Sequence, residues 1–413
     1  MTKSDTTLSI QIIGNATDPH TRGRATAVAR HGANVTILSQ EKYGCNEIKE
    51  KVITAPLLPG PFRRLQTFRF ALQWIRELQQ ADVTHIHYAR EFGAWMSLIA
   101  GTTPVVVSTM GGDVLKKERW HEMNPFEAAL TKRVLTSADL VTAKSDFLAK
   151  AAMDLGVRSE CIYKTVWGVD TSVFHPTSTP MGTVCERFGL PEQGPFLLYP
   201  RSIAPLYNTH VAVEALALIR NDFPDTKLLL AGGHPNPEYL AKVRETIRKH
   251  SLEESVFILG GLDQKAMPDL YNLADVTLSL AGTDGLPQAL LESMACGTPC
   301  ILTRLDRFSD FVSDKVNALL AAPTPEDVKR AASQLLGDKA LRTTIIKSGL
   351  ATIANRGDLH NESGKLLPIY EKLAANRHPK PFATRIFAGI LFGLNVFYPL
   401  FVRLKKKIQE KTN

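Results

Sequence analysis

Residues 271–302, YNLADVTLSLAGTDGLPQALLESMACGTPCIL, hold two short apolar runs with a helix-like segment between them. The runs at 276–280 and 299–302 predict buried strands. Residues 285–287 suit a tight turn, and 288–295 have helical character. A strand, a helix and a second strand in this order predict a parallel βαβ unit, and with it the α/β fold class.

The rest of the sequence continues this alternation. Further strands are expected at 8–13, 35–39, 83–87, 104–109, 140–143, 196–199, 227–231 and 256–259, with helices over 21–31 and 363–373. Strands separated by helical stretches indicate parallel sheets, whose ligands bind beyond the carboxyl ends of the strands. We therefore predict two parallel-sheet domains with a cleft between them.

A change in composition divides the two strand–helix series. Residues 175–195 hold four prolines and few apolar runs, which predicts an interdomain linker. The expected organisation is a first domain at 1–177, a second domain at 178–376 that ends in a closing helix, and a tail at 377–413.

Composition and charge exclude several classes of protein. The chain has 413 residues, 44% of them hydrophobic and 22% charged, so it is not disordered as a whole. The segment 380–413 carries +6 of the net charge of +8, which argues against a uniformly basic nucleic-acid binder. Five cysteines without metal-ligand spacing, and an N-terminus without an apolar signal core, predict a cytoplasmic location.

The tail combines an apolar segment with a cationic end. Residues 386–402 carry no charge, and RLKKKIQEK follows them. As a helix this segment would span ~25 Å, less than the ~30 Å core of a bilayer, and Pro399 interrupts it. Aromatic residues beside the basic cluster favour a shallow anchor on an anionic membrane surface. The alternative is a hydrophobic helix packed on the body of the protein.

Two further patterns suggest contact surfaces. Residues 60–80 mix four arginines with four aromatic residues, and 116–120 form a second basic–aromatic spot, so both are candidates for membrane contact. For the first, a domain helix with one buried face is the alternative. Gly389 and Gly393 form a GxxxG pair, which hints at close helix contact.

Two carboxylates lie close to the start of the predicted helix at 288–295, Asp284 before it and Glu292 within it. The amino end of a helix favours phosphate or sugar oxygens, because its N–H groups are unpaired and its dipole is positive there. Glu292 would accept hydrogen bonds from a ribose diol. The structural alternative is an ordinary capped helix with acidic residues near its start.

The first half offers three polar candidates near strand ends. Asp113 follows two glycines and would orient an acceptor hydroxyl or act as a base, whereas the alternative is a helix N-cap. His87 lies at the end of a predicted strand, where a histidine is more often a core residue than a catalyst. His20 lies in the first loop, and both interpretations stay open for it.

Four ordered segments resemble the family 4 glycosyltransferases, which are nucleotide-sugar enzymes of the GT-B fold with two facing Rossmann-like domains. They are WGVDTSVFHP at 167–176, YPRSIAPLYNTHVAVEAL at 199–216, VFILGGLDQKAMPDLYNLADV at 256–276, and the stretch at 271–302. The resemblance spans roughly residues 9–373. It implies catalysis by the chain without a cofactor, the nucleotide sugar being a substrate.

The resemblance also implies roles for individual residues. Arg201 would neutralise the donor diphosphate, Glu292 would hold the ribose, and Asp284 would contact the donor sugar as a catalytic residue alongside Asp113. The other donor-binding residues expected are Gly261, Tyr207, Gly285, Leu286, Pro287 and Gln288. A first-domain loop with His20 and Arg22, together with His87, would serve the acceptor.

Some positions depart from the family pattern. Tyr207 stands where the family usually has a lysine six residues after the arginine, so one phosphate-neutralising charge is missing. Arg304, Lys144 and Arg22 are candidates to replace it. Met110 stands where the family often has a histidine.

The sequence has no Asp-x-Asp metal signature, so metal-independent transfer is expected, and the resemblance implies retention of the anomeric configuration. We expect a membrane-associated glycosyltransferase at the cytosolic face, acting on a lipid-linked glycan or glycolipid in cell-surface polysaccharide or glycoconjugate synthesis. The alternatives are a nucleotide-sugar epimerase or phosphorylase of the same fold, and a degenerate scaffold marked by Tyr207 and Met110.

Overall fold

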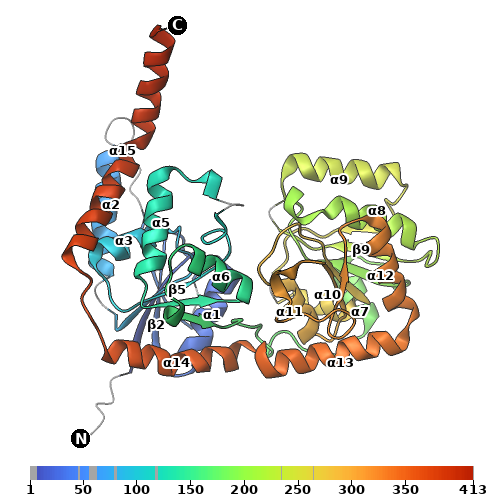
Figure 1. The fold of residues 1–413 in the computed structure, drawn as a ribbon. Coiled ribbons are helices and arrows are strands. Elements are labelled where there is room, and N and C mark those ends of the chain that lie inside the picture. Colours follow the sequence, from blue (N-terminus) through green and yellow to red (C-terminus); the bar gives the residue numbers. More distant parts are fainter. Residues whose placement is uncertain are drawn as a thin grey trace, which may run out of the picture. The chain divides into compact units, whose positions relative to one another are not determined.

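In the computed structural model, which describes residues 7–44, 47–54, 63–78, 81–116, 120–233, 235–263 and 265–412, the chain forms two compact units. Unit 1 comprises Met1–Thr165 and Ser363–Asn413, and unit 2 comprises Val166–Glu362. Within the described residues, each unit has one parallel sheet with helices packed around it (Figure 1). The predicted α/β class with two parallel-sheet domains is confirmed.

The described strands of unit 1 lie in the order β3-β2-β1-β4-β5-β6-β7. They are β1 Ser9–Ile13, β2 Asn34–Ser39, β3 Lys49–Val52, β4 Val83–Ile86, β5 Val105–Ser108, β6 Leu140–Ala143 and β7 Ile162–Lys164. Ile13 pairs with Leu38 on one side and Ile86 on the other, so β1, β2 and β4 end at one edge. The strand order reverses between β1 and β4, where open α/β sheets form ligand crevices.

The helices of unit 1 that the structure describes cover this sheet. They are α1 Pro19–Arg30, α2 Arg63–Glu77, α3 Phe92–Ala100, η2 Trp120–Glu122, α5 Pro125–Ser137, α6 Asp146–Asp154 and η3 Ser159–Cys161, followed by α14 Leu359–Ala375 from Ser363 onward and α15 Phe382–Thr412. Helix α1 begins two residues earlier than expected, because Asp18 caps it and Pro19 takes its first position.

The described strands of unit 2 lie in the order β10-β9-β8-β11-β12-β13. They are β8 Phe196–Tyr199, β9 Lys227–Leu230, β10 Val256–Ile258, β11 Val276–Ser279, β12 Cys300–Thr303 and β13 Leu319–Ala321. The order reverses between β8 and β11, so the loops after these strands flank the expected ligand crevice.

The helices of unit 2 follow the strands in alternation. They are α7 Met181–Phe188, η4 Pro205–Tyr207, α8 Thr209–Ile219, α9 Pro237–Lys249, α10 Met267–Leu273, α11 Gln288–Ala295, η5 Asp306–Phe308, α12 Pro325–Gly337 and α13 Lys339–Arg356. Sequence patterns missed β3, β7 and β13. The first has the charged sequence KEKV and the other two are only three residues long, so none forms an apolar run of strand length.

The linker prediction was wrong. The boundary between the units lies at Thr165 and Val166, not at 177 and 178, and residues 175–195 belong to unit 2. Helix α7 forms inside this segment, and its Val184 and Cys185 are buried in the core of unit 2. Pro180 precedes the helix as its N-cap residue, so proline here marks the start of an element instead of an open linker.

The end of the second domain also lies earlier than the expected residue 376. Residues from Ser363 onward belong to unit 1, although they continue helix α14. Tyr370 of this helix is fully buried, and its hydroxyl lies 2.9 Å from Nδ1 of His85 on β4. The second half of α14 is therefore part of the core of unit 1, and the expected closing helix of the second domain is shared.

The expected tail is a structural part of unit 1. Helix α15 lies beside α2, α3 and α5 (Figure 1), and Ala388, Leu391 and Phe392 are buried in the core of that unit. Polar contacts also hold it in place: Asn124 Nδ2 donates to Asn395 Oδ1 at 2.8 Å, and Arg385 Nε donates to the Ile99 carbonyl oxygen at 3.3 Å. Just before the helix, Lys380 Nζ lies 2.9 Å from a carboxylate oxygen of Asp139. One face of α15 therefore packs on the body of the protein.

The other face of α15 stays apolar and exposed. Among the described residues, its exposed large apolar side chains are Phe382, Ile386, Phe387, Ile390, Leu394, Phe397, Leu400 and Val402. The window 382–400 is long and apolar enough to cross a membrane, by length and composition alone. The helix runs through Pro399, and a Cβ added to Gly389 or Gly393 would meet open space, so the GxxxG pair makes no close contact within the described chain.

The aromatic residues of α2 face inward. Phe70 and Trp74 are buried, Phe68 packs against the same core, and Arg69 and Arg76 are exposed. This part of the segment at 60–80 is thus a domain helix with one buried face, as the alternative interpretation had it. Residues 60–62 lie outside the described residues, as do 117–119 of the second basic–aromatic spot.

Candidate functional site

The loop between β11 and α11 holds the predicted donor-binding residues of unit 2. The backbone N–H of Gly285 donates to Asp284 Oδ1 at 2.8 Å, and Leu286 is buried beneath the loop. Pro287 is extended and offers no side chain that caps the helix. The N–H of Leu290 donates to the Pro287 carbonyl oxygen at 3.1 Å, which leaves the N–H groups of Gln288 and Ala289 for an anion or for sugar oxygens.

Gln288 opens α11 and ties the helix to another predicted segment. Its Nε2 donates to the carbonyl oxygen of Gly168 at 3.1 Å. Gly168 belongs to the WGVD segment, which the structure places in unit 2. The side chain of Gln288 is thus used to position a neighbouring loop.

Arg201 follows β8 and meets Asp284, which follows β11. Its Nη2 lies 2.8 Å from Asp284 Oδ2, and both side chains are more than four-fifths buried. Burial lowers the pKa of Arg201, but Asp284, Tyr207 and Tyr199 outweigh it and raise the pKa above its ordinary value. The guanidinium is therefore a permanent charge, held in place beside the start of α11.

Tyr207 supplies an aromatic face where a lysine was expected. The Arg201 guanidinium carbon lies 4.5 Å from the centre of the Tyr207 ring. The hydroxyl of Tyr199 donates to the Tyr207 carbonyl oxygen, which holds the turn of η4. Stacking orients the guanidinium, but it adds no second positive charge.

A further arginine, which sequence reasoning missed, reaches the same loop. Arg307, in η5 after β12, donates from Nη1 to Oγ1 of Thr283, the residue before Asp284. The candidate Arg304 is engaged elsewhere, with Asp314 Oδ2 at 2.8 Å and the carbonyl oxygen of Leu320 at 2.7 Å. The only available signal for Arg307 was its position just after a strand that neighbours β11.

Glu292 lies on α11, about one turn from its start. It accepts a hydrogen bond from the Tyr271 hydroxyl at 2.8 Å. Burial raises the pKa of Glu292 to about 7, against the lowering effects of Tyr271 and Arg201. Tyr271 therefore holds the carboxyl in one orientation, and in its ionised form the carboxylate can accept hydrogen bonds from hydroxyls.

Two glycines allow the loops after β8, β9 and β10 to approach one another. A Cβ on Gly232 would lie 1.8 Å from the carbonyl oxygen of Arg201, and a Cβ on Gly261 would lie 3.0 Å from Cα of Gly233. Gly261 was expected to border the nucleotide base. The structure places it at this crowded edge of the sheet, and its contact with a base stays a prediction.

In unit 1, Asp113 shapes a loop. Its Oδ1 accepts from the backbone N–H groups of Met110 and Gly111 at 2.9 and 3.1 Å, and its Oδ2 accepts from Ala89 at 3.2 Å. The residue has no exposed surface, and burial raises the pKa of its carboxyl against these hydrogen bonds. All three N–H groups belong to residues that precede Asp113, so its carboxylate holds the backbone before it, and its catalytic role stays a prediction.

His87 belongs to a buried polar cluster with His85, Arg24 and Tyr370. The two imidazoles meet edge to face, with ring centres 4.6 Å apart. Burial lowers the pKa of His85 to about 3 and that of His87 well below its ordinary value, and it lowers the pKa of Arg24 to about 10. These histidines are neutral core residues, so the structural interpretation of His87 is favoured.

The first loop of unit 1 is held by its own side chains. Asp18 accepts from the backbone of His20, and Arg22 donates to the carbonyl oxygens of Ala16 and Thr17 at 2.9 and 2.7 Å. The Arg22 guanidinium also lies 3.5 Å from the centre of the Tyr43 ring. Arg22 is thus engaged locally, and an acceptor role for His20 and Arg22 stays a prediction.

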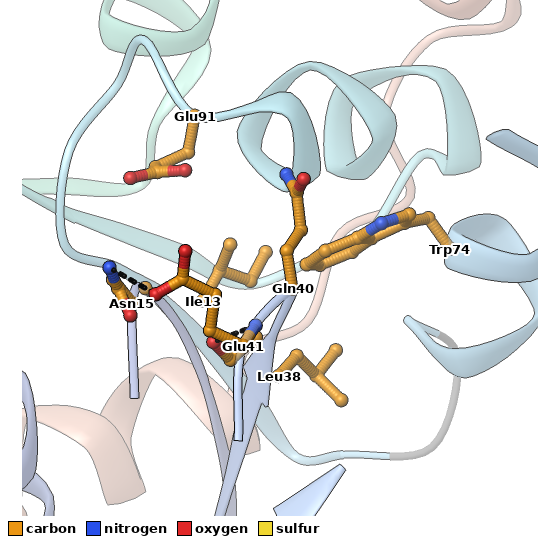
Figure 2. Close-up of a pocket in the computed structure, with 9 residues that line it drawn as sticks. Ile13, Asn15, Leu38, Gln40, Glu41, Trp74 and Glu91 are labelled. Atoms are coloured by element: carbon orange, nitrogen blue, oxygen red, sulfur yellow. Dashed lines mark hydrogen bonds between the residues drawn. The ribbon is translucent and has the colours of Figure 1, made fainter. Parts of the chain in front are cut away.

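A pocket of about 210 Å³ opens beside this loop, at the carboxyl ends of β1 and β2 (Figure 2). Its lining residues are Ile13, Gly14, Asn15, Leu38, Ser39, Gln40, Glu41, Trp74 and Glu91. Sequence reasoning singled out the loop that contains Asn15 and the aromatic residues that include Trp74, but it did not predict that the polar lining residues meet in one pocket. They come from four separate segments, which only folding brings together.

In the part of the chain that the structure describes, no group of three or more His, Cys, Asp or Glu side chains is placed to hold a metal ion. The described cysteines, Cys161, Cys185, Cys296 and Cys300, are buried and free.

Comparison with known proteins identifies the family. The family model for glycosyl transferases group 1 matches residues 185–351, and the model for glycosyltransferase family 4 matches residues 20–173. Together they cover most of both units. The chain belongs to the family 4 glycosyltransferases.

Relatives of this glycosyltransferase carry names that specify different acceptors. A D-inositol 3-phosphate glycosyltransferase of Jonesia denitrificans is 22% identical, over 84% of this chain and 89% of its own length. A GDP-mannose-dependent alpha-(1-6)-phosphatidylinositol monomannoside mannosyltransferase of Mycolicibacterium smegmatis is 26% identical, over 58% of this chain and 62% of its own.

A solved structure has the same fold as this glycosyltransferase. It is Anabaena Alr3699/HepE in complex with UDP-glucose, which has a TM-score of 0.76 at 16% identity. The match covers 89% of this chain and all of that one. The GT-B fold class predicted from the sequence is therefore confirmed.

Proposed function

We propose that this glycosyltransferase moves a sugar from a nucleotide diphosphate donor to an acceptor carried by a membrane lipid, with retention and without a metal ion. The observation that carries the proposal is the arrangement at the carboxyl edge of the unit 2 sheet. Arg201, the amino end of α11 and Glu292 together offer a fixed cation, free N–H groups and a hydroxyl-binding carboxylate. A nucleotide sugar presents the matching diphosphate and ribose.

The chemistry follows from where charge develops. For retention, the acceptor oxygen bonds to the anomeric carbon on the face from which the diphosphate leaves. The bond from that carbon to the diphosphate breaks, negative charge collects on the leaving group, and the acceptor hydroxyl proton passes to an oxygen of that group. Arg201 and the N–H groups of α11 are in place before the reaction, so they stabilise that charge without reorganisation. Arg307, at the loop of Thr283, is the residue we propose as the second cation in place of the missing lysine.

Two comparisons support the substrate classes. The neighbour of the same fold is complexed with UDP-glucose, which supports a nucleotide-sugar donor. The name of the mycobacterial relative specifies a phosphatidylinositol-linked acceptor, which supports a lipid-carried acceptor.

The exposed face of α15 supports a location at the membrane. Ile386, Ile390 and Leu394 form an apolar stripe at helical spacing, between 38% and 55% exposed. The sequence after it is strongly basic, as expected for contact with anionic lipid. We propose that α15 lies on the cytosolic face of the membrane with this stripe in the headgroup region.

Donor transfer tests the catalytic part of the proposal. Purified protein would be incubated with UDP-, GDP- and ADP-sugars, and release of the nucleotide would be measured with and without EDTA. We expect one donor to be turned over, equally fast with the chelator. If no nucleotide binds in a titration, the chain is a scaffold and the proposal fails.

Vesicle flotation tests the membrane part. Removing α15 would open the core of unit 1, so substitutions on its exposed face are preferable. The triple variant Ile386→Asn, Ile390→Gln and Leu394→Gln should lose binding to anionic vesicles, whereas Val316→Gln, at an exposed site in unit 2, should keep it. Equal flotation of both variants would contradict contact through this face.

A further inference from the structure

Tyr271 is a buried residue of α10 to which the proposed chemistry gives no part so far. It has no accessible surface, and its hydroxyl donates to Oε2 of Glu292 on α11 at 2.8 Å. Burial raises the pKa of this phenol well above its ordinary value, and the charge of Glu292 raises it further. The hydroxyl therefore keeps its proton and is a permanent donor to the carboxyl that we assign to the ribose.

The packing around Tyr271 fixes the place of its hydroxyl. Its ring meets that of Phe174 edge to face, with ring centres 6.0 Å apart. Its backbone carbonyl oxygen accepts a hydrogen bond from Oγ1 of Thr298 at 2.5 Å. All three residues are buried, so the ring cannot shift without opening the close-packed core of unit 2. A donor held in this way is a fixed support for a side chain that contacts a ligand.

Only one oxygen of Glu292 is engaged by the described part of the chain. The hydrogen bond from Tyr271 goes to Oε2, and no other described residue donates to this side chain. Glu292 is partly exposed, and Oε1 is not one of the buried atoms that lack a partner, so this oxygen is open to a ligand. An ionised carboxylate accepts hydrogen bonds from a diol at full strength, whereas a protonated carboxyl carries a hydrogen of its own.

Few groups act on the charge of Glu292. Those that the described structure sets against it are Tyr271, Arg201 after β8, and Cys296 just after α11. Burial raises the pKa of the Cys296 thiol to about 12 and also raises that of Cys300, whose thiol faces Tyr271, so both stay neutral. Burial raises the pKa of Glu292 to about 7, while the Tyr271 hydrogen bond and, to a smaller extent, Arg201 lower it. The tyrosine hydroxyl thus favours the ionised carboxyl.

We propose that Tyr271 is a positioning residue of the donor site: its hydroxyl holds Oε2 of Glu292 so that Oε1 meets the ribose hydroxyls, and it stabilises the ionised form that accepts them. This inference rests on the proposed function, because it explains how the assigned ribose-binding carboxylate is held and charged. A proton linkage follows. When a nucleotide binds to protein whose Glu292 is protonated, that proton leaves Glu292 for the solvent, so recognition of the ribose strengthens as the pH rises.

The wild-type protein gives the first test. UDP, GDP and ADP would be titrated calorimetrically between pH 6 and pH 9, each beside its 2′,3′-dideoxy form. Because both forms carry the same diphosphate, the ratio of their affinities isolates the contribution of the ribose hydroxyls. For the base that binds, we expect the ratio to rise about tenfold over this range, with a midpoint near pH 7. A ratio that does not change with pH overturns the inference.

The second test removes the hydroxyl and keeps the ring. Tyr271→Phe should move the midpoint up by about one pH unit, so that the ratio falls about fivefold at pH 7 and returns to within about twofold of wild type at pH 9. Tyr370→Phe is the matched control, because it deletes an equally buried hydroxyl that is bonded to His85 in unit 1. Its profile should be that of wild type, and circular dichroism would check the fold of both variants.

A merely structural role of Tyr271 gives a different result. The Tyr271→Phe substitution would then lower the ratio by the same factor at every pH or leave it unchanged, and either result overturns the inference. An equal shift of the midpoint in Tyr370→Phe overturns it as well. Nucleotide binding with a ratio independent of pH removes the role of Tyr271 and leaves the proposed function standing, whereas binding of none of the three nucleotides refutes both.

Discussion

Polar residues follow the strands at the carboxyl edges of both sheets, but those of unit 2 are partly exposed and those of unit 1 are buried. In unit 2, Arg201 and Asp284 lie in loops beyond the strands, pair with each other and stay partly exposed. In unit 1, Asp113 and His87 also follow strands, yet they are buried, and Asp113 is held by three backbone N–H groups. A polar residue after a parallel strand is therefore no guide to chemistry by itself, because the neighbouring loop decides whether it faces a ligand or supports the backbone.

The largest expected effect is on the fixed cation of unit 2. Arg201→Ala should lower kcat/KM by about 10²–10³-fold, because it removes a preorganised charge from the leaving diphosphate. Steady-state transfer with the preferred donor would measure this. Arg304→Ala is the control, since its guanidinium is engaged with Asp314, and it should stay near the wild-type rate. Comparable losses in both variants would mean that the diphosphate lies elsewhere.

The second-largest expected effect is on Glu292, the carboxylate on α11. Glu292→Ala should lower kcat/KM about a hundredfold, as expected when hydrogen bonds from two hydroxyls to a charged group are lost. The same transfer assay applies, with circular dichroism to check the fold. Wild-type transfer by this variant would show that the assigned donor site is wrong.

Substitution in unit 1 should affect stability instead of chemistry. Asp113→Ala leaves three buried N–H groups without their acceptor, which should reduce the free energy of unfolding by about 2–3 kcal/mol. Urea denaturation followed by circular dichroism would measure this, while nucleotide titration should remain unchanged. If the variant keeps its stability and loses transfer, Asp113 takes part in the reaction and the proposed difference between the two sheet edges is wrong.

Glu292 should also give unit 2 a distinctive pH dependence. The unfolded carboxyl titrates near 4.5 and the folded one near 7, so between these values folding takes up a proton. This raised pKa means that stability falls as the pH rises through the window. Glu292→Gln removes the effect, so its stability relative to wild type should grow by about 2–3 kcal/mol between pH 5 and pH 8. Urea midpoints at several pH values would show the difference, and a constant difference would contradict the buried, raised pKa.

The smallest effect concerns the aromatic face beside Arg201. Tyr207→Ala removes the stacking that orients the guanidinium, which should weaken nucleotide binding about threefold. Tyr207→Phe keeps the ring and should bind as wild type does. Isothermal titration with the cognate nucleotide would distinguish them, and equal affinities for all three proteins would leave Tyr207 without a part in the site.

Much of the fold and part of the candidate site could be predicted from the sequence. Buried strands such as 140–143 and 196–199 were predicted to the residue, because continuous apolar runs between turn residues have few other uses. Arg201, Asp284 and Glu292 were found because they lie in segments with strong local patterns. Arg307 was not, because it follows β12 and reaches the loop after the neighbouring strand β11 only in the folded sheet. The pocket that Glu91 and Trp74 line was not predicted either, because these residues meet only when α2 and α3 pack against β1.

The sequence by itself determined the class of fold, the family resemblance and the charge asymmetry of the chain. These depend on local periodicity and composition, which tertiary contacts do not alter. Only the tertiary structure decided where the units divide and that α15 buries one face and exposes the other. It also decided that Asp113 is fully buried, whereas Asp284 pairs with Arg201 and stays partly exposed. Burial and hydrogen-bond partners arise from residues far apart in the chain, so no local pattern contains them.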